Sequence, residues 1–284
     1  MKATLSFLRQ RLSALYPPRE VEAMIRVIFE ELKGWSRVDV LMHKDSELSD
    51  YIKEKIARVV ERLERNEPLQ YVLGAAHFAG RRFRVTPATL IPRPETAQLV
   101  DIITERNSEA TDLRVLDIGT GSGCIAITLA LNLRFAQVTA TDVSADALAV
   151  ARGNAEELHA RGITFTREDI LTAVPVPDSF DIIVSNPPYI ARSEAATMER
   201  NVLDYEPHSA LFVDDARPLL FYKAIASYAA TALTAGGQLY LEINNRYAEE
   251  MRRLLADEGM TDIDILRDLN GLYRFAIAVK PAKR

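Results

Sequence analysis

The 284-residue sequence contains a single cysteine, which excludes an internal disulfide framework and any metal site built from several cysteines. Glycine and proline are scarce, at 12 and 13 residues, so the chain is neither collagen-like nor of low complexity. The apolar run from Cys124 to Leu131 is interrupted by a threonine and is far shorter than the ~18 residues that a membrane span needs. The N-terminus carries scattered charges and no apolar block before a cleavage site, unlike a signal peptide. We therefore expect a soluble, cytoplasmic protein.

A strong positive charge is also missing. Residues 1–95 hold 17 Lys and Arg against 13 Asp and Glu, whereas residues 96–284 hold 18 against 27. No run of Lys or Arg exceeds two residues, which is more typical of a solvated helical surface than of a patch that meets an acidic partner. A dedicated duplex-DNA-binding protein has a much stronger basic bias. We expect no stable binding to nucleic acid and no membrane association.

The first 74 residues have helical periodicity. Leucines three and four residues apart predict a helix over 5–15 that ends before Pro17, and a similar pattern predicts a second helix over 19–32, with Gly34 as its stop. A third helical segment follows Ser49. These residues predict a small helical bundle, which by itself indicates no chemistry.

The residue pattern of the sequence changes after the bundle. Glycines and prolines alternate with apolar residues, which predicts a hairpin and linker over 75–95. Strand-like runs then alternate with helical ones, so residues 96–284 are expected to form an α/β domain with a mostly parallel sheet. The last two strands are separated by a short turn and predict an antiparallel hairpin at the sheet edge. Strands are predicted over 114–118, 137–142, 163–168, 180–185, 238–243, 263–266 and 273–279, and helices over 123–132, 145–160, 219–234 and 246–258.

A glycine-rich loop follows the first strand of this domain, in the run Val-Leu-Asp-Ile-Gly-Thr-Gly-Ser-Gly. Glycines let the backbone adopt positive φ and approach a ligand closely. The dinucleotide fingerprint needs a glycine five residues after Gly119, where this chain has Cys124, and no phosphate-binding P-loop occurs. A carboxylate at Asp117 disfavours a pyrophosphate but suits a ligand with an ammonium and a sulfonium, and therefore indicates S-adenosylmethionine. The predicted cofactor-binding residues here are Asp117, Gly119, Thr120, Gly121, Ser122 and Gly123.

Two further acidic residues follow the next two strands. Asp142 lies 25 residues after Asp117, about the offset at which a carboxylate binds ribose hydroxyls. Asp169, followed by Ile170, is placed to accept a hydrogen bond from the adenine amino group. The alternatives are that Asp142 is a turn or helix-capping residue and that Asp169 has no ligand role.

The strand predicted over 180–185 leads into Asn186-Pro187-Pro188-Tyr189. The prolines stiffen the backbone and remove two N–H donors, so the Asn186 side chain and a proline carbonyl can accept both hydrogens of a substrate NH2 group. Tyr189 can stack on a planar group. An amide or aromatic amine nitrogen is a poor nucleophile, and two acceptors that orient it opposite a methyl donor favour its methylation. Asn186 to Tyr189 are the predicted catalytic residues, and Asn186 is also expected to contact the cofactor.

These motifs resemble the release-factor glutamine methyltransferases, the HemK/PrmC family, along nearly the whole chain. The run Leu-Ile-Pro-Arg-Pro-Glu-Thr is the most specific, because the Asn-Pro-Pro-Tyr motif also occurs in DNA adenine methyltransferases. Some positions depart from the family pattern, among them His77 and Ala97, and they concern local loops. The stretches that carry the resemblance are 67–74, 90–96, 186–189, Glu206-Pro207, Asp268-Leu269 and Gly271.

The resemblance implies a Rossmann-like S-adenosylmethionine-dependent domain that methylates the glutamine amide in the Gly-Gly-Gln loop of peptide-chain release factors. It implies that Gly119 to Gly123, Asp142 and Asp169-Ile170 hold the cofactor and that Asn186 to Tyr189 hold the glutamine amide. Arg93 and Glu95 are implied to order the linker, and the helical bundle to contact the release factor. We expect a monomer without a metal ion.

Two other functions stay open at this point. The same tetrapeptide could methylate an adenine amino group in nucleic acid, although the acidic second half and the lack of a base-reading domain disfavour this. A binding module that uses the cofactor fold without catalysis is disfavoured by the intact Asn-Pro-Pro-Tyr motif.

Overall fold

The computed structural model describes residues 1–282, which divide into two compact units, 1–75 with 199–205, and 76–198 with 206–282. None of the helices among the described residues combines the length and apolar character needed to cross a membrane. The two units are described separately below.

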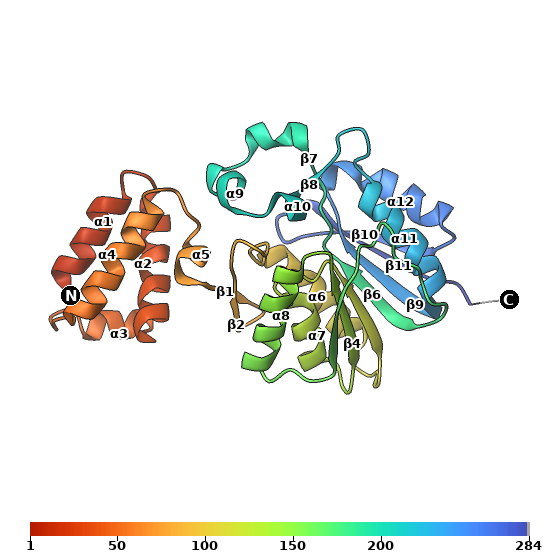
Figure 1. Ribbon diagram of the computed structural model, residues 1–284, viewed down its shortest axis with the longest axis horizontal. Coiled ribbons are helices and arrows are strands. Elements are labelled where there is room, and N and C mark those ends of the chain that lie inside the picture. The colour runs from red at the N-terminus through yellow and green to blue at the C-terminus, as the bar shows by residue number, and fades with distance from the viewer. Residues whose placement is uncertain (283–284) are drawn as a thin grey trace. The chain divides into compact units, whose positions relative to one another are not determined.

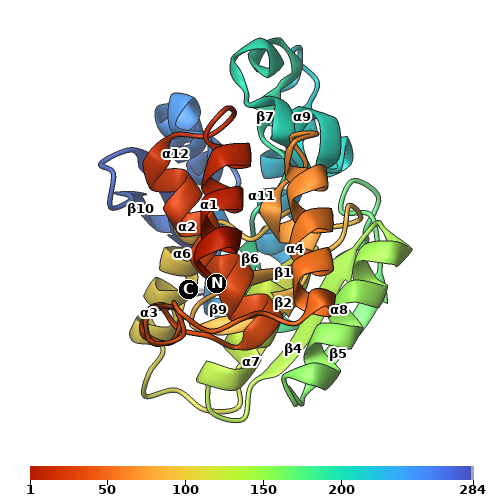
Figure 2. The same cartoon turned by 90° about the vertical axis from the view of Figure 1, so that its left-hand side faces the viewer.

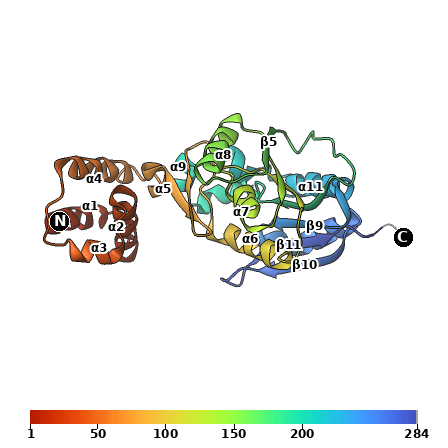
Figure 3. The ribbon, with the colours of Figure 1, turned by 90° about the horizontal axis from the view of Figure 1, so that it is seen from below.

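The first unit is a helical bundle in which α1, α2 and α4 lie side by side (Figure 2), with α3 beside them in the view of Figure 3. Apolar side chains at helical spacing on α2 and α4 form its core, among them Ile28 and Ile56. The Ser36 and Asp39 side chains form a capping box that starts α3. The helices are α1 (Lys2–Leu12), α2 (Pro18–Lys33), α3 (Arg37–Met42), α4 (Asp50–Leu63), α5 (Leu69–Leu73) and α9 (Arg200–Tyr205).

Two features of this unit differ from the predictions. The first helix ends at Leu12, with Ser13 as its C-cap, and so stops well before the prolines that were expected to end it. Residues 199–205, which come from the second half of the sequence, belong to this unit, where the Tyr205 hydroxyl donates to the Arg65 carbonyl oxygen at 2.8 Å. No local sequence signal marks such a long-range association.

The second unit is built around a seven-stranded sheet with the order β10-β11-β9-β6-β3-β4-β5. Five of these strands, β9, β6, β3, β4 and β5, run parallel to one another. Strand β11 is antiparallel to both β9 and β10. The predicted parallel sheet with an antiparallel edge hairpin is therefore confirmed. The strands are β3 (Arg114–Ile118), β4 (Gln137–Asp142), β5 (Ile163–Arg167), β6 (Phe180–Ser185), β9 (Leu233–Glu242), β10 (Thr261–Arg267) and β11 (Tyr273–Val279).

Helices cover both faces of this sheet (Figure 1), because successive strand residues point to opposite faces. On β6, Ile182 and Val184 pack against α6 and α7, whereas Ile183 packs on the face that α11 and α12 cover. The helices are α6 (Pro94–Arg106), α7 (Cys124–Asn132), α8 (Ala145–Glu157), α11 (Leu220–Ala232) and α12 (Ala248–Asp257), with the 3-10 turn η2 (Asn245–Tyr247) before α12.

Smaller elements complete this unit. The predicted hairpin is present as β1 and β2, and the buried Asn154 of α8 hydrogen-bonds the Arg84 backbone through both amide atoms, at 2.7 and 2.9 Å. Helix α6 and the short elements between β6 and α11 were not predicted. The short elements are β1 (Ala75–Phe78), β2 (Arg81–Arg84), β7 (Ile190–Ala191), η1 (Arg192–Thr197), α10 (His208–Leu211) and β8 (Phe212–Val213).

We expect Ile183→Ala to lower the free energy of unfolding by about 2–5 kcal/mol, because the side chain is fully buried between Leu116 and Leu239 and leaves a cavity when truncated. Val176→Ala, at a position 64% exposed, is the control and should change it by less than about 0.5 kcal/mol. Urea denaturation followed by far-UV circular dichroism measures both, and equal effects would contradict the assigned core.

Candidate active site

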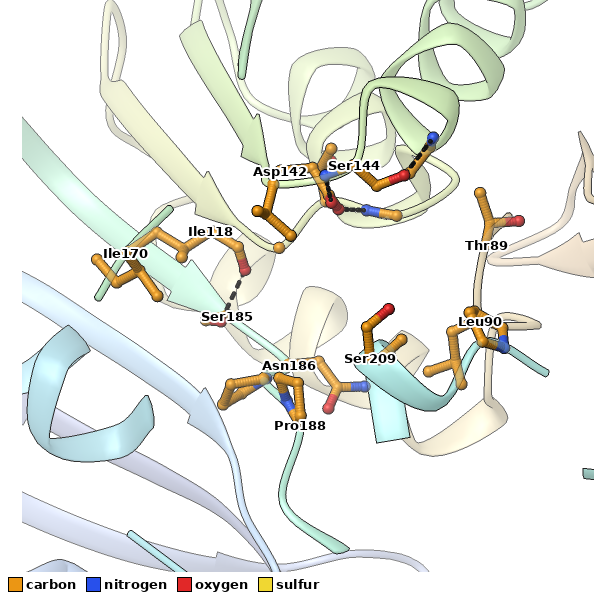
Figure 4. Close-up of a pocket in the computed structure, with 18 of the residues that line it drawn as sticks. Thr89, Leu90, Ile118, Asp142, Ser144, Ile170, Ser185, Asn186, Pro188 and Ser209 are labelled. Atoms are coloured by element: carbon orange, nitrogen blue, oxygen red, sulfur yellow. Dashed lines mark hydrogen bonds between the residues drawn. The ribbon is translucent and has the colours of Figure 1, made fainter. Parts of the chain in front are cut away.

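A cavity of about 350 Å³ lies at the carboxyl edge of the parallel strands in the second unit. Ligands of open α/β sheets bind at this edge, at the point where the strand order reverses. In this sheet the order reverses at β3, which lies between β6 and β4. Its wall contains residues that follow β3, β4, β5 and β6, together with part of the 88–96 segment and of α10 (Figure 4). The volume is that of a small-molecule site.

The glycine loop forms one wall. Gly119, Thr120, Gly121 and Ser122, which the sequence predicted to bind the cofactor, line the cavity. Gly121 has φ +55° and open space where a Cβ atom would lie, so the backbone itself faces the cavity.

Gly123 is not among the lining residues and has a different role. Its φ is +81°, and a Cβ there would lie 2.9 Å from Ile127 Cδ1 and 3.1 Å from Ala151 Cβ. This glycine therefore lets α7 begin close against α8, and its predicted contact with the cofactor stays a prediction.

Asp117 lies beneath the loop and is fully buried. Its Oδ2 atom accepts hydrogen bonds from Thr120 Oγ1 at 2.6 Å and from the Ala126 N–H at 3.1 Å, whereas Oδ1 has no partner among residues 1–282. Burial raises the pKa of Asp117 to about 7. Asp117 is not among the residues that line the cavity, and its carboxyl supports the loop from below. Its predicted contact with the cofactor stays a prediction.

Asp142, Asp169 and Ile170 line the cavity. Asp142 follows the buried part of β4, and its carboxylate accepts the N–H groups of Gly121 and Ser144, both at 2.9 Å (Figure 4). It therefore holds the loop and the start of α8 together at the cavity. Asp169 accepts the Leu171 N–H at 3.0 Å. Carboxylate oxygens accept more than one hydrogen bond, so both residues can also bind ligand hydroxyl or amino groups.

Asn186, Pro187 and Pro188 line the cavity opposite the glycine loop, but Tyr189 does not. The Tyr189 ring packs against the apolar cluster of α11 and α12, and its hydroxyl donates to Glu242 Oε1 at 3.2 Å. Burial raises the pKa of Tyr189 well above its ordinary value. Tyr189 thus supports the turn from behind, and its predicted stacking on a planar substrate group stays a prediction.

Residues 89–93 form a further part of the wall. Glu206, 4% exposed, accepts the Ile91 N–H at 3.1 Å and pairs with the Arg93 guanidinium at 2.5 Å. The ion pair fixes the linker, which agrees with the ordering role that the resemblance implied for Arg93.

Sequence reasoning missed two buried residues behind Asn186, Thr96 and Glu242, which are 2% and 1% exposed. Thr96 accepts a hydrogen bond from Asn186 and donates one to Glu242. The signal that could have found Glu242 is a lone acidic residue inside the apolar run 239–243.

The cavity suits a cationic ligand. Its wall carries the acidic residues Asp142, Glu168 and Asp169 against one basic residue, Arg93, whose charge Glu206 already balances. The buried Asp117 carboxyl adds further acidity beneath the loop, and its unpartnered Oδ1 favours a positive charge nearby. A sulfonium and an ammonium fit this wall, whereas a pyrophosphate does not. Within residues 1–282, no group of three His, Cys, Asp or Glu side chains is arranged to hold a metal ion.

Two family models match separate parts of this chain. The family model described as PrmC N-terminal domain matches residues 3–74, and the one described as Methyltransferase small domain matches residues 95–204. The release factor glutamine methyltransferase of Bacteroides thetaiotaomicron is 47% identical over 279 residues, which cover 98% of this chain and 99% of that protein. This chain belongs to the release factor glutamine methyltransferase family. The family member of Lactococcus lactis subsp. lactis is 40% identical and covers 94% and 95% of the two chains.

Solved structures share the fold of the family's catalytic half. The ribosomal protein L11 methylase from Lactobacillus delbrueckii subsp. bulgaricus has a TM-score of 0.50 at 22% identity, over 71% of this chain and 86% of that chain. A methyltransferase from Pyrococcus furiosus has a TM-score of 0.50 at 18% identity, over 70% and 88%. At such identities the likeness shows the fold alone, and it confirms the predicted methyltransferase fold.

The raised pKa of Asp117 predicts a pH effect on stability. Because the carboxyl binds its proton more tightly in the folded chain, stability falls as the pH rises from about 4, the unfolded value, to about 7. Asp117→Asn removes this titration, so across that window the variant should gain about 1.4 kcal/mol per pH unit relative to the wild type.

Urea denaturation of both proteins at several pH values between 4 and 8 measures the difference. Asp146→Asn, at an exposed position in the first turn of α8, controls for the loss of one carboxylate. A stability difference that does not change with pH would show that Asp117 is not desolvated as described.

Proposed function

We propose that this protein transfers the methyl group of S-adenosylmethionine to the side-chain amide nitrogen of the glutamine in the Gly-Gly-Gln loop of a peptide-chain release factor. One observation carries the proposal: Asn186 lies on the wall of the same cavity as the glycine loop and Asp142. The relatives are named release factor glutamine methyltransferases, and they match this chain along nearly their whole length. Their names support the choice of substrate.

The residues that follow β3, β4 and β5 are proposed to hold the cofactor. S-adenosylmethionine supplies, when bound, an electrophilic methyl group on a sulfonium. The backbone of Gly119 to Ser122 lets this ligand approach closely, Asp142 accepts hydrogen bonds from ribose hydroxyls, and Asp169 with Ile170 holds the adenine. The acidic wall favours the cationic donor over the neutral thioether product, S-adenosylhomocysteine, which helps the product to leave.

Asn186 and Pro187 are proposed to hold the substrate amide. An amide nitrogen is a poor nucleophile because its lone pair is delocalised into the carbonyl group. The Asn186 side-chain oxygen and the Pro187 carbonyl accept its two hydrogens, which orients the nitrogen toward the methyl donor. Alkylation makes the nitrogen acidic, so one of these hydrogens leaves as a proton and no strong base is required before attack.

The first unit is proposed to recognise the release factor. Residues 3–74 match the family's N-terminal domain, and exposed apolar side chains on α3 offer a contact surface, with Leu41 at 61% and Met42 at 78% exposure. We also expect the enzyme to act as a monomer.

Incubation of the purified protein with methyl-labelled cofactor and a release factor tests the proposal. We expect label in the release factor, with mass spectrometry placing one methyl group on the glutamine of the Gly-Gly-Gln loop. No label should enter a release factor whose glutamine is replaced by alanine. Label in that substrate, or in DNA or RNA instead of the release factor, would contradict the proposed function.

In the same assay Asn186→Ala should abolish measurable transfer, because it removes the acceptor that orients the amide. Affinity for S-adenosylhomocysteine, measured by calorimetry, should stay largely intact. A variant that transfers at the wild-type rate would show that Asn186 does not orient the substrate.

Asp142→Ala should raise the Kd for S-adenosylhomocysteine by about 10–100-fold, because it removes a charged acceptor and releases the Gly121 N–H that it holds. Asp146→Ala is the matched control, since it removes the same charge nearby without lining the cavity. Calorimetric titration compares the two. Equal losses of affinity would mean that net charge matters and the specific contact does not.

A further inference from the structure

A chain of hydrogen bonds runs from Asn186 into the protein interior. Asn186 Nδ2 donates to Thr96 Oγ1 at 3.2 Å, and Thr96 Oγ1 donates to Glu242 Oε2 at 2.6 Å. Tyr189, in the same turn as Asn186, donates its hydroxyl hydrogen to Glu242 Oε1 at 3.2 Å. Both oxygens of this one carboxylate thus act as acceptors behind the cavity wall.

The fold brings Thr96, Glu242 and Tyr189 together, and Thr96 and Glu242 are buried. Glu242 ends β9, whose parallel pairing with β6 sets Leu241 beside Ser185 and therefore Glu242 beside Asn186. Thr96 lies in the first turn of α6, where free N–H groups favour a nearby negative charge. Burial raises the pKa of Glu242 above its ordinary value, and the hydrogen bonds from Thr96 and Tyr189 and the charge of Arg274 oppose this shift.

The Glu242 carboxylate determines which group donates and which accepts in each of these hydrogen bonds. In its ionised form the Glu242 carboxylate can only accept, so Thr96 then directs its single hydroxyl hydrogen toward Glu242, as in the structure. The Thr96 oxygen can then only accept from Asn186, and the NH2 end of the Asn186 amide turns toward it. The oxygen end is left to accept a hydrogen bond from a substrate.

The two ends of an asparagine amide have nearly the same shape but opposite hydrogen-bonding character. With the oxygen toward the substrate, Asn186 accepts a hydrogen from the substrate NH2. With the amide reversed, two NH2 groups would face each other and neither could accept. Packing alone cannot distinguish the two orientations.

We propose that Glu242 and Thr96 are positioning residues for the methyl transfer, which act by fixing the Asn186 side chain with its oxygen toward the substrate amide. The inference rests on the proposed function and adds which residues set the orientation of the Asn186 side chain. Glu242 is not among the residues that line the cavity. Thr96 lines it beside Asn186, and its role is assigned from its hydrogen bonds to Asn186 and Glu242.

Thr96→Val tests this, since it keeps the shape of the side chain and removes the hydroxyl group. We expect kcat for release factor methylation to fall by about 30–100-fold, while KM for the release factor and Kd for S-adenosylhomocysteine change less than about threefold. Thr96→Ser retains the hydroxyl and should keep kcat within about threefold of the wild type.

The Asn186→Asp background separates orientation from general structural support. A carboxylate presents an oxygen whichever way it turns, so this variant should give measurable transfer where Asn186→Ala gives none. In that background Thr96→Val should change kcat by less than about threefold. A purely structural role for Thr96 would lower kcat equally in both backgrounds.

The outcomes are distinguishable. A wild-type enzyme that does not methylate the release factor overturns the proposed function. A wild-type enzyme that does so, combined with a Thr96→Val variant of unchanged kcat, equal losses in both backgrounds, or an inactive Asn186→Asp variant, overturns only the orientation role. If Thr96→Val does not fold, Glu242→Gln replaces it, because it turns one acceptor into a donor and should give the same dependence on residue 186.

Discussion

Parallel pairing of β3 with β4 on one side and with β6 on the other is the constraint on which the site depends. It brings together the carboxyl ends of strands that are far apart in the chain, so that the glycine loop, Asp142 and Asn186 share one cavity. Ser185 reinforces this pairing, because its hydroxyl donates to the Ile118 carbonyl oxygen at 2.7 Å, directly before both functional turns. Any slip of β6 against β3 would move Asn186 away from the cofactor loop.

Two buried carboxyl groups serve this arrangement in different ways. Asp117 supports the glycine loop from below and keeps an unpartnered oxygen beside it, whereas Glu242 receives two hydroxyl hydrogens behind the Asn186 turn. Burying an acidic group is unfavourable unless it is hydrogen-bonded or meets a positive charge. Their presence at one edge of the sheet, beneath both halves of the site, is consistent with a cavity built for a cationic methyl donor and a weakly nucleophilic amide.

Several features of the structure were not predicted from the sequence. Helix α6 was missed, although its N-terminus carries Thr96, because Pro94 and the neighbouring polar residues are typical of a linker as much as of a helix start. The hydrogen bond between Tyr189 and Glu242, which are 53 residues apart in the chain, was not predicted either. The association of residues 199–205 with the helical bundle was likewise invisible. Contacts between distant segments leave no local pattern that periodicity or motif spacing can detect.

By itself, the sequence determined the alternation of strands and helices, the antiparallel edge hairpin, the glycine loop and the order of Asp142, Asp169 and Asn186 along the chain. These features are local, since backbone preferences and apolar periodicity act over a few residues. Only the tertiary structure decided which of these side chains face the cavity, that Asp117 and Tyr189 support it from behind, and that Thr96 and Glu242 hold Asn186. Those outcomes depend on strand register and burial, which arise when distant segments pack together, as Thr96 and Glu242 do across 146 residues.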